Sequence, residues 1–328
     1  SLTCSRTRSI FILFAIVLFA SPRLFGQDES KSVPDTSPVR AVEIAFPSSV
    51  DDAVQKAVFH AAKTTVAMPL VVSLHSWSGD HSQDDPLAEK VIAAGWNYIH
   101  PDFRGPNNKP DACLSDKVIA DIDDAIQYAL DNGPADRDAV FVVGGSGGGH
   151  ATLGVYLRTR HRIRLFLSWV PISDLTAWYW ESKSRANKYA DDIVLCTSTT
   201  GTFEEQGARE RSPLYWPVPK DIKGRLEIYA GINDGYTGSV PVSHTLRFYN
   251  KMAEHFGRPD AQVSEADMIR LLARGVAPNP ALGHIEDRPV LYRKEMPQVA
   301  VAIFEGGHEL LVDHCLSRMR AEAEKNTP

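Results

Sequence analysis

The sequence is poor in cysteine and has no excess of positive charge. It holds four cysteines among 328 residues, and its 35 Lys and Arg residues face 41 Asp and Glu residues, for a net charge of −6. So few cysteines exclude a small disulfide scaffold, and a chain of this length can bury a large core without such cross-links. The lack of a basic stripe excludes nucleic acid as a partner.

The sequence also lacks an apolar run long enough to cross a bilayer, which needs about 20 residues. Residues 10–20 form an apolar run of eleven, with Arg6 and Arg8 before it and small residues after it. This pattern is typical of a secretory signal peptide over residues 1–26, with an uncleaved anchor as the alternative. We therefore expect a secreted or periplasmic protein, with no stable membrane insertion after cleavage and a disordered leader over residues 27–38.

Two signatures of metal and phosphate binding are missing. The sequence has no H-E-x-x-H pair to hold zinc, and its one glycine-rich run carries no G-K-[ST] ending that would cradle a phosphate. It has no internal repeat either. We expect no cofactor and no metal, so any catalysis has to come from the side chains themselves.

Three cysteines lie outside the expected signal peptide. An exported protein can hold disulfides, and both Cys113 and Cys196 fall in loop-like segments beyond expected strands. These two are the favoured pair, with Cys315 buried and free. The alternative is three unpaired thiols packed in the interior.

Strand and helix patterns alternate along most of the chain. Strand patterns recur over residues 69–75, 96–100, 138–143, 162–171, 225–231 and 299–304, and helical patterns over 85–95, 115–131, 151–157 and 242–256. This order predicts an α/β fold, with a mostly parallel, doubly wound sheet and helices on both faces. A strand over residues 39–47 precedes it, and residues 50–62 favour the second strand of a hairpin over a helix.

Two stretches interrupt this alternation within the domain that we expect over residues 39–328. Residues 173–218 are rich in aromatic and polar side chains and are predicted to form a lid. Residues 257–298 form a second insertion, with a short helix near 264–273 and a Pro-rich tail. The pattern leaves the role of this second insertion open.

Ser146 lies in the run Gly144-Gly145-Ser146-Gly147-Gly148-Gly149, between an expected strand and an expected helix. A G-x-S-x-G run in this context predicts a nucleophile elbow, in which a strained turn presents the serine hydroxyl at the edge of the sheet. The glycines allow the strand and helix to pack closely. The alternatives are a plain turn and a loop that cradles phosphate at a helix N-terminus.

A serine nucleophile needs a base and an orienting acid, which follow it in the order acid, then histidine, in folds that carry this elbow. His308 comes directly after the last expected strand, behind two glycines, and is predicted to be the base. Asp234 follows the preceding expected strand and is predicted to be the acid, with Asp174 as its rival. The oxyanion would be bound by the backbone N–H of Gly147 and by that of Ser76 or Trp77.

These residues together resemble an α/β-hydrolase, and within that superfamily the catalytic domain of the prolyl oligopeptidase (S9) family. The likeness covers about residues 65–256 and 299–312. The pieces that carry it are Leu74-His75-Ser76-Trp77, Asp102-Phe103-Arg104-Gly105, the glycine run around Ser146, Ser212-Pro213, Asp234 and Gly307-His308. It implies an α/β-hydrolase fold in which Ser146 is the nucleophile, Asp234 the acid and His308 the base.

The chain has Gly147 where the family usually carries an aromatic residue, and His75-Ser76-Trp77 where its peptidases usually supply a tyrosine. These differences favour a serine hydrolase that acts on a small-molecule or polysaccharide-linked ester, most simply an esterase for carbohydrate or aryl esters. A serine peptidase of the prolyl oligopeptidase type and a non-catalytic, ligand-binding homologue are the alternatives.

Three further side chains are candidates for binding the substrate. Trp178 and Trp180 in the expected lid offer aromatic faces that stack on sugars or aryl groups, although such rings also serve to attach a lid to its domain. Arg104 offers a guanidinium for a carboxylate, or else forms a structural ion pair.

Overall fold

The computed structural model describes residues 40–325. The expected signal peptide over residues 1–26 and the expected leader over 27–38 lie outside the described residues, and both stay predictions. Within residues 40–325, no helix is both long enough and apolar enough to span a membrane.

A ten-stranded sheet forms the centre of the domain, in the order β1-β2-β4-β3-β5-β6-β7-β10-β9-β8. The strands are β1 (Val42–Pro47), β2 (Val54–His60), β3 (Met68–Leu74), β4 (Asn97–Pro101), β5 (Ala135–Gly145), β6 (Leu165–Trp169), β7 (Arg225–Gly231), β8 (His284–Ile285), β9 (Arg288–Glu295) and β10 (Val299–Phe304). The six strands from β4 to β10 in this order are parallel. The expectation of a mostly parallel sheet is confirmed.

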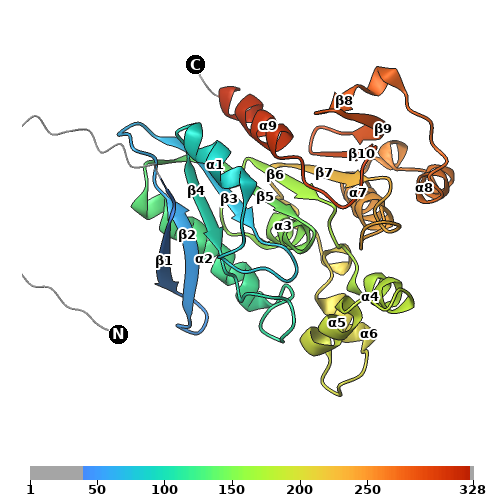
Figure 1. Ribbon diagram of the computed structural model, residues 1–328, viewed down its shortest axis with the longest axis horizontal. Helices are drawn as coiled ribbons and strands as arrows, with labels where there is room; N and C mark the ends of the chain where they lie inside the picture. The colour runs from blue at the N-terminus through green and yellow to red at the C-terminus, as the bar shows by residue number, and fades with distance from the viewer. Residues whose placement is uncertain (1–39, 326–328) are drawn as a thin grey trace, which may run out of the picture. The chain divides into compact units, whose positions relative to one another are not determined.

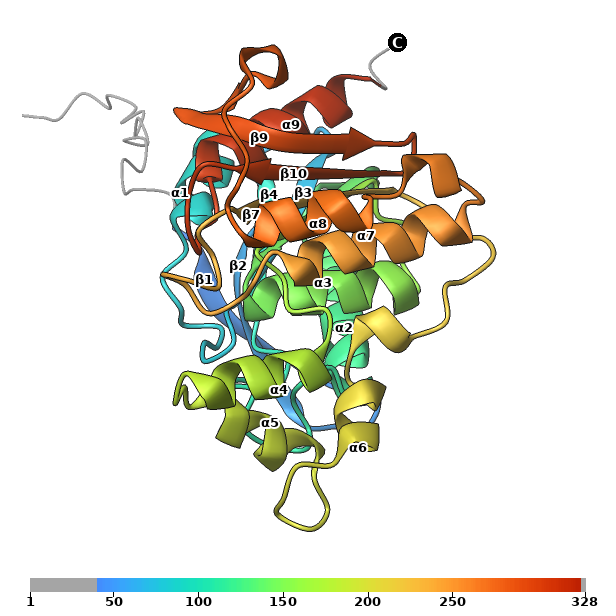
Figure 2. The same ribbon diagram turned by 90° about the vertical axis from the view of Figure 1, so that its right-hand side faces the viewer.

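Helices cover both faces of this sheet. The long ones are α1 (Pro86–Ala93), α2 (Asp116–Asn132), α3 (Gly147–Arg158), α7 (Ser243–His255) and α9 (Val312–Glu324). Helix α1 packs against α9 on one face, and α2 packs against α3 on the other, where α7 also lies (Figures 1 and 2). The central strands are therefore buried on both sides, which is why they read as continuous apolar runs rather than as alternating patterns.

Antiparallel strands extend the sheet at both edges. At one edge β2 pairs with β1 and with β4, which confirms the predicted hairpin. At the other edge β9 pairs with β10, and the short β8 pairs with β9. Strand β9 lies inside the insertion over residues 257–298, where the sequence indicated only a Pro-rich tail. The strand was missed because its own residues, with two adjacent buried positions among polar ones, show no clear strand pattern, and its pairing with β10 is seen only in the structure.

The expected lid over residues 173–218 is helical and has a small apolar cluster of its own. It consists of α4 (Leu175–Ser184), α5 (Tyr189–Thr197), α6 (Glu205–Glu210) and the short helix η1 (Pro213–Tyr215). Helices α4 to α6 lie together, away from the main helical layers, in both views (Figures 1 and 2). Trp77 and Cys113 from the main domain belong to the lid cluster rather than to the main core. The lid therefore packs directly against the loop that follows β3.

The second insertion, over residues 257–298, adds short elements beside α7. These are η2 (Pro259–Ala261), α8 (Glu265–Leu272) and η3 (Pro280–Leu282), ahead of β8 and β9. Helix α8 packs on α7, and η3 packs on β9.

All three described cysteines are buried, free thiols. Cys113 and Cys196 share the lid cluster, where burial and the neighbouring Cys196 thiol raise the pKa of Cys113. The two side chains that we expected to pair are therefore neighbours, but the structure holds them as free thiols within the lid cluster, against the favoured disulfide.

Candidate active site

Ser146 occupies a strained turn between β5 and α3. Its backbone has φ 57° and ψ −116°, a left-handed value that a side chain with a Cβ rarely adopts. Two hydrogen bonds hold the turn: the Ser146 N–H donates to Trp169 O at 2.9 Å, and its carbonyl accepts from the His150 N–H at 2.9 Å. This is the geometry expected of a nucleophile elbow.

Glycine is needed where the strand and the helix cross next to Ser146. A Cβ on Gly144 would lie 2.2 Å from the carbonyl oxygen of Gly148, and a Cβ on Gly148 would lie 2.2 Å from that of Leu74. Any larger residue would push α3 away from β5 and β3. The glycine run therefore sets the height of the serine above the sheet.

The structure places Asp234 against His308, although 74 residues separate them. Asp234 Oδ2 lies 2.7 Å from His308 Nδ1, while Oδ1 accepts from the N–H groups of Gly235 at 2.9 Å and Val240 at 3.0 Å. The carboxylate is buried and accepts every bond it makes, so it orients the imidazole with Nδ1 protonated. His308 Nε2 is then left as the acceptor.

Asp174, the rival acid, is used elsewhere. Its Oδ1 caps α4 by accepting from the N–H groups of Thr176 and Ala177, at 2.9 and 3.2 Å. Its Oδ2 accepts from Tyr215 Oη at 2.8 Å and from an Arg247 nitrogen at 2.7 Å. The structure therefore brings Asp234, and not Asp174, to the histidine.

Ser146 and His308 line one pocket of about 260 Å³. Within the described part of the chain, the Ser146 hydroxyl makes no hydrogen bond, so it is free to turn toward the imidazole or a substrate. Apart from His308, the ionisable side chains of the lining are carboxylates, those of Asp84, Asp85 and Glu309. Glu309 also pairs with Arg288 on β9, at 2.9 Å, and its Oε1 accepts from the Gly307 N–H.

Gly147 and Trp77, two of the expected oxyanion donors, are in close contact. A Cβ on Gly147 would lie 2.2 Å from the backbone nitrogen of Trp77 and 2.8 Å from the carbonyl carbon of Ser76. The space beside Ser146 is therefore filled by the loop after β3. The inference that Gly147 favours an ester substrate is therefore wrong, because the absence of a side chain there makes room for the backbone of the protein itself.

Trp178 cannot bind a substrate. Its side chain is fully buried, its ring lies 4.8 Å from that of Trp77 in an edge-on contact, and its Nε1–H donates to Ser239 O at 2.8 Å. It attaches the lid to the loop that follows β3 and carries Ser76 and Trp77, which we call the oxyanion loop. Trp180 is 58% exposed, but no residue of the lid lines the pocket of Ser146.

Arg104 is likewise structural. It is only 7% exposed, and its guanidinium binds Asp121 through Nε at 2.5 Å and Asp51 through a terminal nitrogen at 2.8 Å. These ion pairs tie the loop after β4 to α2 and to the hairpin turn. The expectation that Arg104 binds substrate is therefore wrong.

The lid and the second insertion meet at a different pocket, of about 310 Å³, which Asp234 also lines. Glu181 of α4, Leu272 of α8, Tyr236 and Asp234 line it. The Tyr236 hydroxyl also hydrogen-bonds to Leu272 O. The second insertion thus buttresses the loop that carries Asp234, a role that no local pattern indicated.

One cluster of side chains has the composition of a metal site. The ligand atoms of Asp80, His81 and Asp102 all lie within 4.8 Å of one another. However, His81 lies between Asp102 Oδ1 at 3.2 Å and Glu43 Oε2 at 3.0 Å, and Asp80 accepts two bonds from Ser82. These ion pairs and turn bonds account for the cluster, and we assign it no metal.

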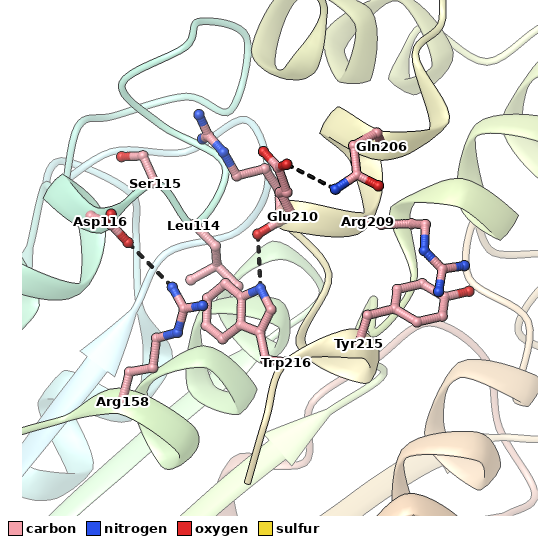
Figure 3. Close-up of a pocket in the computed structure, with 10 residues that line it drawn as sticks. Leu114, Ser115, Asp116, Arg158, Gln206, Arg209, Glu210, Tyr215 and Trp216 are labelled. Carbon is pink, nitrogen blue, oxygen red and sulfur yellow. Dashed lines mark hydrogen bonds and ion pairs between the residues drawn. The ribbon is translucent and has the colours of Figure 1, made fainter. Parts of the chain in front are cut away.

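A larger pocket, of about 550 Å³, lies between α6, η1 and the adjoining ends of α2 and α3 (Figure 3). Its polar groups already have partners: the Arg158 guanidinium stacks 3.4 Å from the Trp216 ring and binds Asp116, and Glu210 accepts from Gln206. None of the residues that line it belongs to the triad. The candidate active site is therefore the smaller pocket that Ser146 and His308 line.

Gln83 and Glu309 also line the pocket of Ser146, and neither was predicted from the sequence. Glu309 follows the expected base directly, and this adjacency was the one signal that could have found it. Gln83 lies in a polar loop with no periodicity, so nothing in the sequence indicates its hydrogen bond to Ser76 in the same loop.

Comparisons with solved structures support the fold. An acylaminoacyl peptidase of Pyrococcus horikoshii aligns with a TM-score of 0.59 at 16% identity, over 87% of this chain and 41% of its own. A puromycin-hydrolyzing peptidase of Mycobacterium tuberculosis aligns with a TM-score of 0.56 at 16% identity, over 86% of this chain and 38% of its own. The chain thus spans about two fifths of these proteins, and the α/β-hydrolase fold is confirmed. A comparison with curated proteins found no match.

A family model also matches the sequence, so the relationship is not limited to the fold. The model of the prolyl oligopeptidase family, a peptidase family, matches residues 89–268, a segment that includes Ser146 and Asp234. This match overturns the expectation of an esterase for carbohydrate or aryl esters, and it confirms the resemblance noted from the motifs. The chain is a serine hydrolase and belongs to the prolyl oligopeptidase family.

Proposed function

We propose that this protein is a serine peptidase that cleaves amide bonds of short peptides or of aminoacyl compounds through an acyl-enzyme. The observation that carries the proposal is the strained Ser146 in one pocket with the His308–Asp234 pair, inside a domain of a peptidase family. Two of the aligned structures, an acylaminoacyl peptidase and a puromycin-hydrolyzing peptidase, have activities that concern amide bonds.

The chemistry follows from the geometry of the three side chains. His308 Nε2 takes the proton of Ser146 Oγ as this oxygen attacks the substrate carbonyl carbon. The buried Asp234 carboxylate stabilises the imidazolium that forms, and the backbone N–H groups near Gly147 bind the oxyanion. His308 then protonates the leaving amine, and a water molecule hydrolyses the acyl-enzyme by the same steps.

The proposal is tested with amide and ester substrates in parallel. We expect turnover of aminoacyl or short-peptide p-nitroanilides, with kcat/KM for at least one amide well above that of the Ser146→Ala variant. p-Nitrophenyl acetate serves as the ester, since an acyl-enzyme route cleaves activated esters too. Turnover of esters with no turnover of any amide would refute the peptidase assignment while leaving the serine hydrolase intact.

The acid assignment has a matched pair of carboxylates. We expect Asp234→Asn to lower kcat by about 10⁴-fold, because the imidazole loses its orientation and its charge partner. Asp174→Asn should leave kcat within a few fold and lower stability instead, because that carboxylate caps α4. The opposite result would assign the acid to Asp174.

A further inference from the structure

We infer that Gln83 is a positioning residue for the oxyanion hole, and that its side chain makes the N–H of Trp77, rather than that of Ser76, the second donor to the oxyanion. This inference rests on one part of the proposed function, the acyl-transfer step at Ser146. It applies to ester and amide substrates alike.

Gln83 engages both donors of Ser76. The Ser76 N–H donates to Gln83 Oε1 at 2.9 Å, and the Ser76 hydroxyl donates to the same oxygen at 2.6 Å. An N–H that already has a good acceptor gains little from a substrate oxyanion. Ser76 is therefore removed from the two donors that the sequence left open.

The N–H of Trp77 is the next one along the chain, and it is unpaired. Between residues 40 and 325 it has no acceptor, whereas the other polar groups of Trp77 are engaged: its carbonyl accepts twice from Asn107, and its Nε1–H donates to Asp192 at 3.1 Å. The residue is only 2% exposed. A backbone N–H left unpaired in such a place is costly unless a ligand supplies the acceptor.

The free N–H of Trp77 also lies in the right place. Its nitrogen is 2.2 Å from the point that a Cβ of Gly147 would occupy, so the loop backbone touches the first turn of α3 next to Ser146. Gly147 begins α3, and its own N–H is one of those that a helix cannot pair internally. The two N–H groups therefore flank the nucleophile from two different elements.

The peptide unit that joins Ser76 to Trp77 is held from its other side. Its carbonyl, Ser76 O, accepts from the Gly79 N–H at 3.1 Å and lies 2.8 Å from His75 Nδ1. In a planar trans peptide the N–H points opposite to the carbonyl, so these contacts aim the Trp77 N–H toward Gly147. Gln83 fixes the preceding peptide by its N–H and thereby opposes a flip of the loop.

Glutamine fits this role because one amide oxygen accepts both bonds within a tight loop. The Gln83 N–H donates to Asp80 O at 3.1 Å, which closes the turn, and a Cβ on Gly79 would lie 2.2 Å from Gln83 Oε1. The side chain therefore reaches Ser76 across a position that only glycine leaves open. Gln83 acts through Ser76 and Trp77, without taking part in proton transfer.

The test is Gln83→Leu, which keeps the approximate volume and removes the acceptor, with Gln83→Met as a second variant should the first fold poorly. Rates are measured on p-nitrophenyl acetate and on the best amide. Removing one oxyanion donor costs about 10²–10³-fold in kcat, and we expect a loss of about 10–100-fold for a donor that is misaligned, with KM within about twofold. Gln206→Leu, on α6, is the surface control and should change neither constant.

A transition-state probe separates positioning from general structure. Phenylboronic acid forms a negatively charged tetrahedral adduct with a nucleophilic serine, so its inhibition constant should rise by about the factor that kcat falls. If Ser76 were the donor, Gln83→Leu would free its N–H, and kcat would hold or rise. An unchanged or higher kcat, or an unchanged affinity for phenylboronic acid, would overturn the inference. Because kcat is also measured on p-nitrophenyl acetate, an ester, this outcome is distinguishable from failure of the peptidase assignment.

Discussion

At the scale of single residues, the site depends on Gly147, a position with no room for a side chain. Gly147 has the backbone of Trp77 and Ser76 where its Cβ would be. The family resemblance led us to compare the side chains found at this position. The structure shows that the residue is instead determined by the short distance between the backbone of α3 and that of the loop after β3. A residue larger than glycine here acts on the oxyanion hole by moving the loop after β3.

Gly147→Ala is therefore expected to lower kcat by at least about 10²-fold, since the added methyl displaces the Trp77 N–H. The overpacking should also cost about 1–3 kcal/mol in the free energy of unfolding. Steady-state kinetics and urea unfolding measure both effects. Gly275→Ala is the control, because a Cβ there meets only Arg270 O at 3.7 Å. Full activity of Gly147→Ala would mean that the loop and α3 are not in this contact.

At the scale of secondary-structure elements, α4 shows how one helix carries two kinds of tryptophan. Trp178 stacks on Tyr189 at 4.7 Å and meets Trp77 edge-on, so it joins the lid to the oxyanion loop. Trp180, two residues later, lies on the exposed side of the helix and contacts Phe203 at the surface of the lid. The sequence does not distinguish the two tryptophans, whereas the packing of α4 buries Trp178 in a structural contact and leaves Trp180 exposed.

Trp178→Ala should lower the free energy of unfolding by about 3–5 kcal/mol, as expected for a large aromatic side chain removed from a core. Trp180→Ala should change it by no more than about 0.5 kcal/mol, because that ring is largely solvated. Urea denaturation followed by circular dichroism compares the two. Equal effects would contradict the burial that the structure assigns to α4. A larger change in KM than in stability for Trp180→Ala would restore a substrate role for that ring.

At the scale of the whole molecule, buried ionisable groups tie distant elements together. Glu227 on β7 accepts two bonds from Arg318 of α9, at 2.9 and 2.8 Å, and one from Arg225 at 2.8 Å. Burial alone would raise the pKa of Glu227, but these hydrogen bonds outweigh burial and lower it to about 2. The C-terminal helix is thus attached to the middle of the sheet by a charge pair as well as by apolar packing.

Glu227→Gln should cost about 3–5 kcal/mol at neutral pH, because it leaves two arginines without their buried partner. The stabilising effect of Glu227 is fully present above its ordinary pKa of 4.5 and is lost as pH falls toward 2. The difference in unfolding free energy between wild type and variant should therefore shrink over this range. A constant difference from pH 7 to pH 3 would show that the effect comes from packing and not from the charge.

Histidines whose pKa is lowered by burial, His75, His150 and the half-buried His314 among them, make the fold sensitive to milder acid. Burial lowers the pKa of His150 and of His314 to about 4, from an ordinary value of 6.5. The unfolded chain therefore binds more protons than the folded one between these values, and stability is lost as pH falls from 6.5 to 4. His314→Gln should reduce the slope of unfolding free energy against pH in this window, whereas the exposed His255→Gln should leave it unchanged. An unaltered slope in His314→Gln would contradict the lowered pKa of this half-buried imidazole.

Much of the fold could be predicted from the sequence, because the parallel strands are short apolar runs between amphipathic helices. The runs over residues 225–231 and 299–304 coincide with β7 and β10. Strand β9 was missed, since nothing in its own residues distinguishes an edge strand from a polar tail. The favoured disulfide was wrong for another reason: loop-like positions in an exported protein permit a disulfide but do not require one, and the structure holds Cys113 and Cys196 as free thiols.

The candidate triad could be selected by chain order alone, because each member follows a strand of a parallel sheet, and the carboxyl ends of such strands meet at one edge. The sequence by itself thus determined the parallel sheet, the elbow at Ser146 and the set of residues that reach it. Only the tertiary structure decided which groups face the reacting atoms: it buried Trp178 and Arg104, engaged Asp174 elsewhere and brought Gln83 to Ser76. The reason is physical, since periodicity and spacing encode which face of an element is apolar, whereas burial, peptide orientation and hydrogen-bond partners depend on how loops and side chains pack in three dimensions.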